Sequence, residues 1–263
     1  MLTFLVPVKS ERVSSNWPKF CSLFEKTLIS ICNQTDNNFK VVIVCHEKPR
    51  LNFTHKNIHY VHVDFDPPIR AESESDESIN VRRELDKGKK LEIGVSYAQE
   101  RFNTDYIMTV DSDDFISNRI AAFVNQSNKK TPGWYIKNGY IHYSSKSFLL
   151  ATYKFHSLCG SSVIVKPELL QYFFDKDPIL YFDHRLTVIN DIELERFPFY
   201  GGIYSISNGE NHLMNYSKIK KSNNHRDLIS AKGLKRLLNK IGNYSPRLIT
   251  KKLKSEFSFE TSN

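Results

Sequence analysis

Apolar runs and helical patterns alternate along the first half of the chain. Trp17, Phe20, Phe24, Leu28 and Ile31 recur every three or four residues, and KLEIGVSYAQERF (90–102) is also amphipathic, so both segments predict helices. Buried strands are predicted for LTFLVPV (2–8), KVVIVC (40–45), IHYVHVDF (58–65) and DYIMTV (105–110). Strands that alternate with helices favour the α/β class, with a mainly parallel sheet flanked by helices.

Other segments show weaker patterns. A loop of mixed charge is expected from the third strand to about Asp86, including the acidic stretch ESESDES (72–78). PELLQYFF (167–174) carries proline at a plausible first helical position, and a further helix is expected from about Asp183 to Glu195. Strands are expected within GWYIKNGYIHY (133–143), SSVIVKP (161–167) and GIYSISNGENH (202–212).

The positive charge is concentrated near the C-terminus. The net charge is +8, yet residues 218–254 hold 12 Lys and Arg against one acid, a local +11 that leaves about −3 for the rest (8 − 11). Leucines 234, 237 and 238 with Ile241 form a helical apolar stripe flanked by lysines. We expect a basic helical tail at 218–263 that either contacts an anionic membrane surface through 228–254 or packs on the domain.

Two observations suggest where the protein works. No run of 18 apolar residues occurs, and the four cysteines form no CxxC pair, so we expect a cytoplasmic protein, at most peripheral at the inner face of the membrane. No zinc-finger or RNP-type motif accompanies the basic residues, and nucleic acid is therefore not expected as a partner.

The stretch MTVDSDDF (108–115) sets acidic residues directly after a predicted strand. In an extended segment, alternate side chains share a face, so Asp111 and Asp113 would point the same way, with Ser112 opposite. Two neighbouring carboxylates suit a hard divalent cation, Mg²⁺ or Mn²⁺, which in turn would hold phosphate oxygens. The alternative is an ordinary turn or helix N-cap, where Asp is common.

Three segments resemble the GT-A-fold, family-two-like glycosyltransferases: FEKTLISICNQTDNNFKVVIV (24–44), KKLEIGVSYAQERFNTDYIMTVDSDD (89–114) and CGSSVIVKPELL (159–170). They span most of residues 1–215. The resemblance implies a hexosyltransferase-like GT-A domain at 1–217, with a nucleotide-sugar half at 1–115 and an acceptor half at 116–217. It implies inverting transfer from a nucleotide-diphosphate sugar, with UDP as the expected nucleotide, to a glycan or lipid-linked acceptor of the kind used for cell-surface polysaccharides.

The resemblance also implies site residues. Asp111 and Asp113 would hold the Mn²⁺ or Mg²⁺ ion, and His212 in SNGENHLMNY (207–216) is the candidate third ligand, against a purely structural role. Where the family carries an acidic turn after the second strand, this chain has CHEKP (45–49), so His46 or Glu47 is the candidate base contact. The expected donor-binding residues are Pro7, Val8, His46, Lys90 or its neighbour Lys89, Asp111 and Ser112.

Inverting transfer also needs a general base on the acceptor side. We expect Asp183, in the aromatic-rich LYFDHRLTV (180–188), because partial desolvation would raise the pKa of its carboxyl; a helix N-cap is the alternative role. Asp191 is the reserve candidate, and His184 and Arg185 are expected to contact the acceptor.

Two other functions fit parts of this pattern. A sugar nucleotidyltransferase would also bind a nucleotide and a metal on such a sheet, but VPVKSERVSSN (6–16) lacks the glycine-rich phosphate loop expected there. A non-catalytic protein that binds anionic surfaces would show no donor turnover and no effect of metal on nucleotide affinity.

Overall fold

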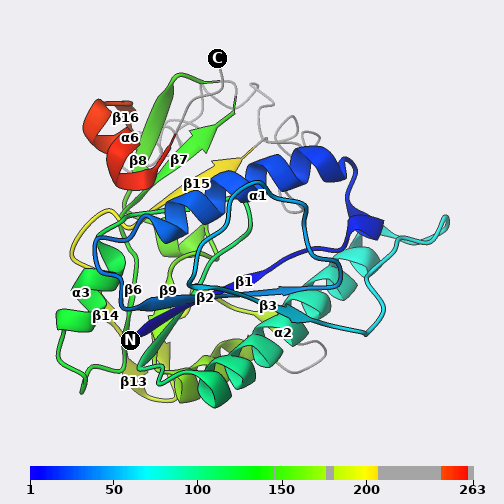
Figure 1. Ribbon diagram of the computed structural model, residues 1–263, viewed down its shortest axis with the longest axis horizontal. Helices are drawn as coiled ribbons and strands as arrows, with labels where there is room; N and C mark the ends of the chain where they lie inside the picture. Colours follow the sequence, from blue (N-terminus) through cyan, green and yellow to red (C-terminus); the bar gives the residue numbers. More distant parts are fainter. Residues whose placement is uncertain (145, 176–180, 207–243, 260–263) are drawn as a thin grey trace, which may run out of the picture.

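The central feature of the computed structural model is a seven-stranded sheet (Figure 1). The structure describes residues 1–144, 146–175, 181–206 and 244–259. In spatial order the strands are β14 (Glu195–Arg196), β6 (Gly133–Tyr135), β9 (Val163–Val165), β4 (Tyr106–Thr109), β1 (Leu2–Pro7), β2 (Phe39–Cys45) and β3 (Ile58–His62). Strands β4, β1, β2 and β3 are parallel, whereas β9 runs antiparallel to β4 and β6. The predicted α/β class with a mainly parallel sheet is confirmed.

Two long helices cover opposite faces of this sheet. Helix α1 (Trp17–Cys32) lies on one side and α2 (Asp76–Arg101) on the other (Figure 1). Side chains of β1 alternate between the two cores: Phe4 belongs with Phe24 of α1, and Leu5 with Leu91 of α2. Burial on both faces explains the continuous apolar runs of the parallel strands.

A second sheet has five strands. Its order is β16 (Tyr244–Leu248), β8 (Phe148–Thr152), β7 (Gly139–Tyr143), β15 (Gly202–Ile206) and β5 (Phe115–Ile116). Phe257, the last residue of helix α6 (Lys251–Phe257), packs with Phe259 against Phe115 and Leu149. Since β5 follows β4 after only a few residues, the acidic stretch 111–114 lies where the two sheets meet.

Short elements complete the described fold. They are the 3-10 helices η1 (Glu11–Val13), η2 (Phe155–Ser157) and η3 (Pro167–Phe173), helix α3 (Ile120–Gln126), and the strand pairs β10 (Phe174–Asp175) with β11 (Tyr181–Phe182) and β12 (Val188–Ile189) with β13 (Ile192–Glu193).

The structure differs from two predicted elements. The loop expected up to Asp86 is helical from Asp76, because the Ser75 side chain caps the first turn of α2. The helix expected from Asp183 to Glu195 was wrong: β12 and β13 form a hairpin there. Its two turn residues, Asn190 and Asp191, have φ of 45° and 62°, the conformation that a two-residue hairpin loop requires.

The described C-terminal residues also differ from the prediction that residues 218–263 form a separate basic helical tail. Strand β16 pairs antiparallel with β8, and α6 buries Phe257 in the domain. Residues 244–259 therefore belong to the folded domain. The apolar stripe around Leu237 lies outside the described residues.

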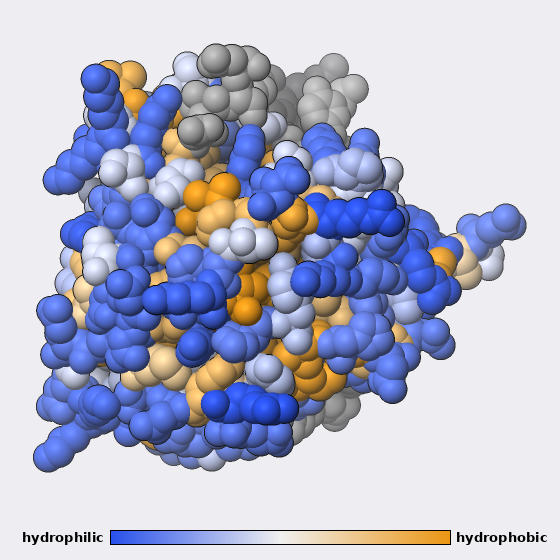
Figure 2. Space-filling view, viewed as in Figure 1, coloured by the Kyte–Doolittle hydropathy of each residue, from blue (hydrophilic) through white to orange (hydrophobic). Residues whose placement is uncertain are grey.

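Polar side chains dominate the visible surface. Figure 2 shows hydrophilic residues over most of this face, with hydrophobic residues gathered mainly in its central part. Among the described residues, no helix is both long enough and apolar enough to cross a membrane.

Candidate functional site

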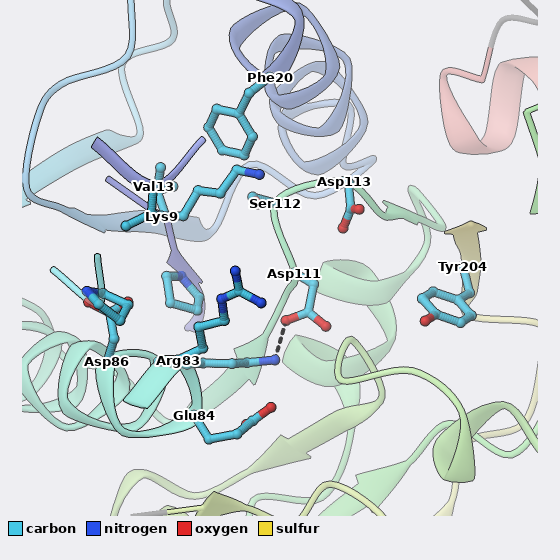
Figure 3. A pocket seen from close by; sticks show the side chains of 14 residues that line it. Lys9, Val13, Phe20, Arg83, Glu84, Asp86, Asp111, Ser112, Asp113 and Tyr204 are labelled. Carbon is cyan, nitrogen blue, oxygen red and sulfur yellow. Dashed lines mark hydrogen bonds and ion pairs between the residues drawn. The ribbon is translucent and has the colours of Figure 1, made fainter. Parts of the chain in front are cut away.

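A pocket opens beside the C-terminal ends of β1 and β4 (Figure 3). Ligands of parallel α/β sheets bind at this edge. Its main lining residues are Pro7, Val8 and Lys9 after β1, Phe20 of α1, Arg83, Glu84, Asp86 and Lys87 of α2, Asp111, Ser112 and Asp113 after β4, and Tyr204 of β15. Figure 3 shows Asp86 toward one end, Tyr204 at the other, and the aspartates with Arg83 between them. The predicted donor residues Pro7, Val8, Asp111 and Ser112 therefore share one pocket.

The aspartates of the DSDD stretch lie in a turn rather than in an extended strand. The Asp114 backbone N–H donates to the Asp111 carbonyl oxygen at 3.3 Å, which closes the turn. Both Asp111 and Asp113 line the pocket, as expected. The turn, rather than the expected alternation of side chains along an extended strand, brings them there.

Lys87 forms an ion pair with Asp111 in the pocket. Its Nζ donates to Oδ1 of Asp111 at 2.5 Å, and each side chain is a little over a quarter exposed (28% and 27%). Burial alone would lower the pKa of Lys87, but Asp111 and Glu84 outweigh burial and raise it. Burial alone would likewise raise the pKa of Asp111, yet Lys87 lowers it. Both groups therefore carry their charges at neutral pH.

Gly160 makes room for this ion pair. A Cβ atom at residue 160 would lie 2.6 Å from Oδ2 of Asp111 and 3.0 Å from Nζ of Lys87. Any larger residue at 160 would therefore have to displace one or both charged side chains.

Behind the pocket, the buried Asp114 anchors the turn. Its Oδ2 accepts hydrogen bonds from Ser161 Oγ at 2.6 Å and Cys159 Sγ at 3.0 Å, and its Oδ1 accepts from the Ser205 backbone N–H at 3.1 Å. The Asp111 N–H in turn donates to Ser161 Oγ at 2.8 Å. Burial, followed by the charges of Asp113 and Asp111, raises the pKa of Asp114 well above its ordinary value. The network connects the buried carboxylate to the backbone of the pocket residue Asp111.

Arg83 is a pocket cation without a counter-ion among the described residues. Its one side-chain hydrogen bond within the described part of the chain is a long one, from Nη1 to Asn80 Oδ1 at 3.4 Å, and its buried Nε has no partner among these residues. Burial, and then the charge of Arg70, lower the pKa of Arg83. A half-buried guanidinium without a carboxylate partner is unfavourable unless an anion completes it, because its buried Nε has given up water without gaining a partner among the described residues.

Glu84 also lines the pocket, and its pKa is raised, whereas that of Asp111 is lowered. Burial is the main cause of the raised pKa of Glu84. The negative charge of Asp111 adds to it, and the positive charge of Lys87 opposes it. Sequence reasoning missed Arg83, Glu84 and Lys87 because the first two fall in the segment expected to be a loop, and Lys87 precedes the helix expected from residue 90. The signal was the spacing of Arg83 and Lys87, which puts two cations on one face of a helix.

The structure does not support Lys90 as a diphosphate contact. Its side chain is 0% exposed, and Nζ donates to the Val8 carbonyl oxygen at 2.8 Å and to Asp86 Oδ2 at 2.7 Å. Lys90 therefore joins α2 to the end of β1 inside the fold. Lys89 points elsewhere: its Nζ lies 5.2 Å from the ring centroid of Phe65, within the range of a cation–π contact.

His46 is also a structural residue here. Its Nε2 donates to the Phe65 carbonyl oxygen at 2.8 Å and lies 3.8 Å from Asp86 Oδ1. Burial, and then Lys90, lower the pKa of His46. The alternative, Glu47, accepts hydrogen bonds from Ser10 and Glu11. Neither residue belongs to the lining of this pocket, so the expected base contact after β2 is not supported.

On the acceptor side, Asp183 is held by Arg185. Arg185 Nε and Nη2 donate to the two carboxylate oxygens at 2.6 and 2.8 Å, and these hydrogen bonds are the main reason that the pKa of Asp183 is lowered. The expected rise in this pKa was wrong. Asp191 lies exposed in the hairpin turn, so the structure gives it no desolvated environment.

His184 lies near the ion pair of the pocket. Its Nδ1 donates to the His156 carbonyl oxygen at 2.7 Å. Burial, and then the charge of Lys87, lower the pKa of His184. The candidate metal ligand His212 lies outside the described residues, among which no group of three or more His, Cys, Asp or Glu side chains could hold a metal ion.

No protein-family model matches the sequence, and no curated protein matches it. Among solved structures, the chain is similar to S. aureus TarS 1-349 in complex with UDP-GlcNAc, with 14% identity, a TM-score of 0.44, and 82% of this chain and 61% of that chain covered. For the complex of TarS 1-349 with UDP the values are 15%, 0.42, 78% and 60%. For S. aureus TarS they are 15%, 0.43, 78% and 37%. The chain thus spans less than two thirds of each of these chains.

Proposed function

We propose that the protein is a glycosyltransferase that moves a sugar from a nucleotide-diphosphate sugar, with UDP as the expected nucleotide, to a glycan or lipid-linked acceptor. The observation that carries the proposal is the composition of the pocket. Arg83, which lacks a counter-ion among the described residues, lies in the same pocket as Asp111 and Asp113. A diphosphate bound there would supply the anion that Arg83 lacks.

The residues present fit a divalent cation that arrives with the nucleotide. Mg²⁺ in such sites is held by one or two carboxylates together with substrate phosphates, and it keeps several waters. Asp111 and Asp113 provide two carboxylates of one turn, and Oδ2 of Asp111 does not take part in the 2.5 Å bond to Lys87. When bound, Mn²⁺ or Mg²⁺ would offset negative charge on the departing diphosphate.

The chain's own residues supply the remaining functions. Arg83 would bind the diphosphate and stabilise the charge that builds on it during transfer. Pro7, Val8 and Phe20 would provide apolar contacts for the nucleoside. Asp183 remains the proposed base for inverting transfer, and an acceptor hydroxyl would have to compete with Arg185 for its carboxylate.

Calorimetry with UDP tests the proposal directly. We expect UDP to bind much more tightly with Mn²⁺ than with EDTA, and Asp113→Asn to lose this difference because an amide is a poorer ligand for a hard cation. Arg83→Met should weaken UDP binding under both conditions. Equal affinity of wild-type protein with Mn²⁺ and EDTA would exclude the metal assignment.

Product analysis separates the alternatives. A glycosyltransferase supplied with a UDP-sugar releases UDP during transfer or slow donor hydrolysis, whereas a sugar nucleotidyltransferase makes or consumes pyrophosphate. A non-catalytic binding protein would do neither. Pyrophosphate exchange without UDP release would overturn the glycosyltransferase proposal.

A further inference from the structure

We propose that Lys87 is an internal counter-ion that blocks metal binding to the empty pocket, so that the divalent cation and the nucleoside diphosphate bind cooperatively. This inference rests on the proposed function, because it concerns the same pocket. Lys87 would then determine how strongly the binding of the divalent cation depends on the nucleoside diphosphate.

The first argument is the position of the ammonium. Nζ of Lys87 lies 2.5 Å from Oδ1 of Asp111, one of the two carboxylates proposed to hold the cation. The pair packs against Gly160, where even a methyl group would collide with it. A cation that enters beside Asp111 therefore meets a positive charge already in contact with its ligand, and that charge must move first.

The second argument is what a diphosphate offers to Lys87. Arg83 and Lys87 are four residues apart on α2, so both cations lie on the face of the helix that lines the pocket. A diphosphate bound by Arg83 would present acceptor oxygens within the same pocket. Lys87 could then exchange Asp111 for a phosphate oxygen, which frees Asp111 for the cation without leaving the ammonium unpaired.

Charge balance leads to the same conclusion. Bare Mn²⁺ would add positive charge where Lys87 has already neutralised Asp111. Bare diphosphate would add negative charge beside Asp111 and Asp113. Each ligand therefore removes the repulsion that opposes the other, and their coupling must be reciprocal.

The test measures Mn²⁺ binding, by calorimetry or by electron paramagnetic resonance of free Mn²⁺, with and without UDP. Wild-type protein should bind bare Mn²⁺ weakly, and UDP should tighten Mn²⁺ binding at least tenfold. Lys87→Met should bind bare Mn²⁺ about tenfold more tightly than wild type, the size expected for removing one charged hydrogen bond. The gain from UDP should shrink by a similar factor.

Two variants serve as controls. Lys89→Met removes a lysine of the same helix that lies over Phe65, outside the pocket lining, and should bind Mn²⁺ like wild type. Lys87→Arg keeps the positive charge and should keep the weak affinity for bare Mn²⁺. Circular dichroism and thermal unfolding check that each variant is folded.

Several results would overturn the inference. Lys87→Met with unchanged or weaker affinity for bare Mn²⁺ would show that the ammonium does not block the ion. Independent binding of Mn²⁺ and UDP to wild-type protein would also overturn it, and this measurement needs no variant. If UDP does not bind at all, with or without Mn²⁺, the proposed function itself fails. If UDP binds equally well with and without Mn²⁺, the metal assignment and the role of Lys87 fail together. If UDP and Mn²⁺ are coupled but Lys87→Met leaves the affinity for bare Mn²⁺ unchanged, only the role of Lys87 fails.

Discussion

Asp113 and Asp114 are neighbours in sequence, yet the structure predicts opposite consequences when each is replaced by alanine. Asp114 is 0% exposed and accepts three hydrogen bonds from other segments of the chain. Asp113 lines the pocket and is partly exposed. We expect Asp114→Ala to lose stability, and Asp113→Ala to lose metal-dependent nucleotide binding while it stays folded.

The size of the loss at Asp114 follows from its contacts. Three hydrogen bonds at roughly 1–2 kcal/mol each contribute about 4 kcal/mol together. Removing the carboxyl also relieves its burial next to Asp111 and Asp113, which offsets part of this loss. The net cost is about 3 kcal/mol, and for a chain of this size the melting temperature should fall by about 6–12 °C. Asp113→Ala should stay within about 0.5 kcal/mol of wild type.

Urea unfolding followed by circular dichroism, together with thermal unfolding, measures both changes. UDP titration with Mn²⁺ then separates binding from stability, because Asp114→Ala should also weaken UDP binding through Ser161 and the Asp111 backbone. An Asp114→Ala protein that melts within about 2 °C of wild type would refute the anchoring argument. So would an Asp113→Ala protein that is equally destabilised.

Three further predictions concern other parts of the fold. Gly160→Ala should weaken UDP binding several-fold in calorimetry with little change in melting temperature, since the new methyl group displaces Asp111 or Lys87; unchanged affinity would contradict that close approach. Asp183→Asn should slow transfer by roughly 10²- to 10⁴-fold. Because Arg185 lowers the pKa of Asp183, Arg185→Ala should move the acidic limb of the pH–rate profile to higher pH, and an unmoved limb would place the base elsewhere. Phe257→Ala should cost about 3–5 kcal/mol in urea unfolding, whereas an independent tail would leave the midpoint unchanged.

The parallel strands were predictable because their physical environment is uniform. Burial on both faces requires apolar residues at nearly every position of β1 and β2, and that requirement is visible in the sequence. The start of α2 was not predictable from the apolar pattern, because residues 76–86 are mostly charged and only partly buried. Ser75 caps this end, and Glu74, just before the helix, pairs with Arg82; both are contacts that an apolar pattern does not reveal.

The candidate site was predictable to the extent that it depends on strand ends. The sequence placed Asp111 and Asp113 after a buried strand, and both line the pocket. Choosing between Lys87 and Lys90 required the phase of α2, since three residues turn a side chain from the pocket toward the Val8 carbonyl oxygen. That phase could not be set while the helix was expected to begin only at residue 90, whereas α2 begins at Asp76. The ion pair of Asp183 with Arg185 depends on the rotamers of two exposed or half-exposed side chains, which no residue pattern determines.

The arrangement of the two sheets has a consequence for synthesis on the ribosome. All strands of the seven-stranded sheet lie within the first 196 residues, so its backbone pairing can be completed while the rest of the chain is still being made. The five-stranded sheet must wait for β15, β16 and the aromatic residues 257 and 259 before Phe115 is covered. Phe115 directly follows the acidic turn. During translation, the half of the fold that carries Arg83 and Lys87 would therefore mature first, and the support of the aspartates would be the last part of the pocket to form.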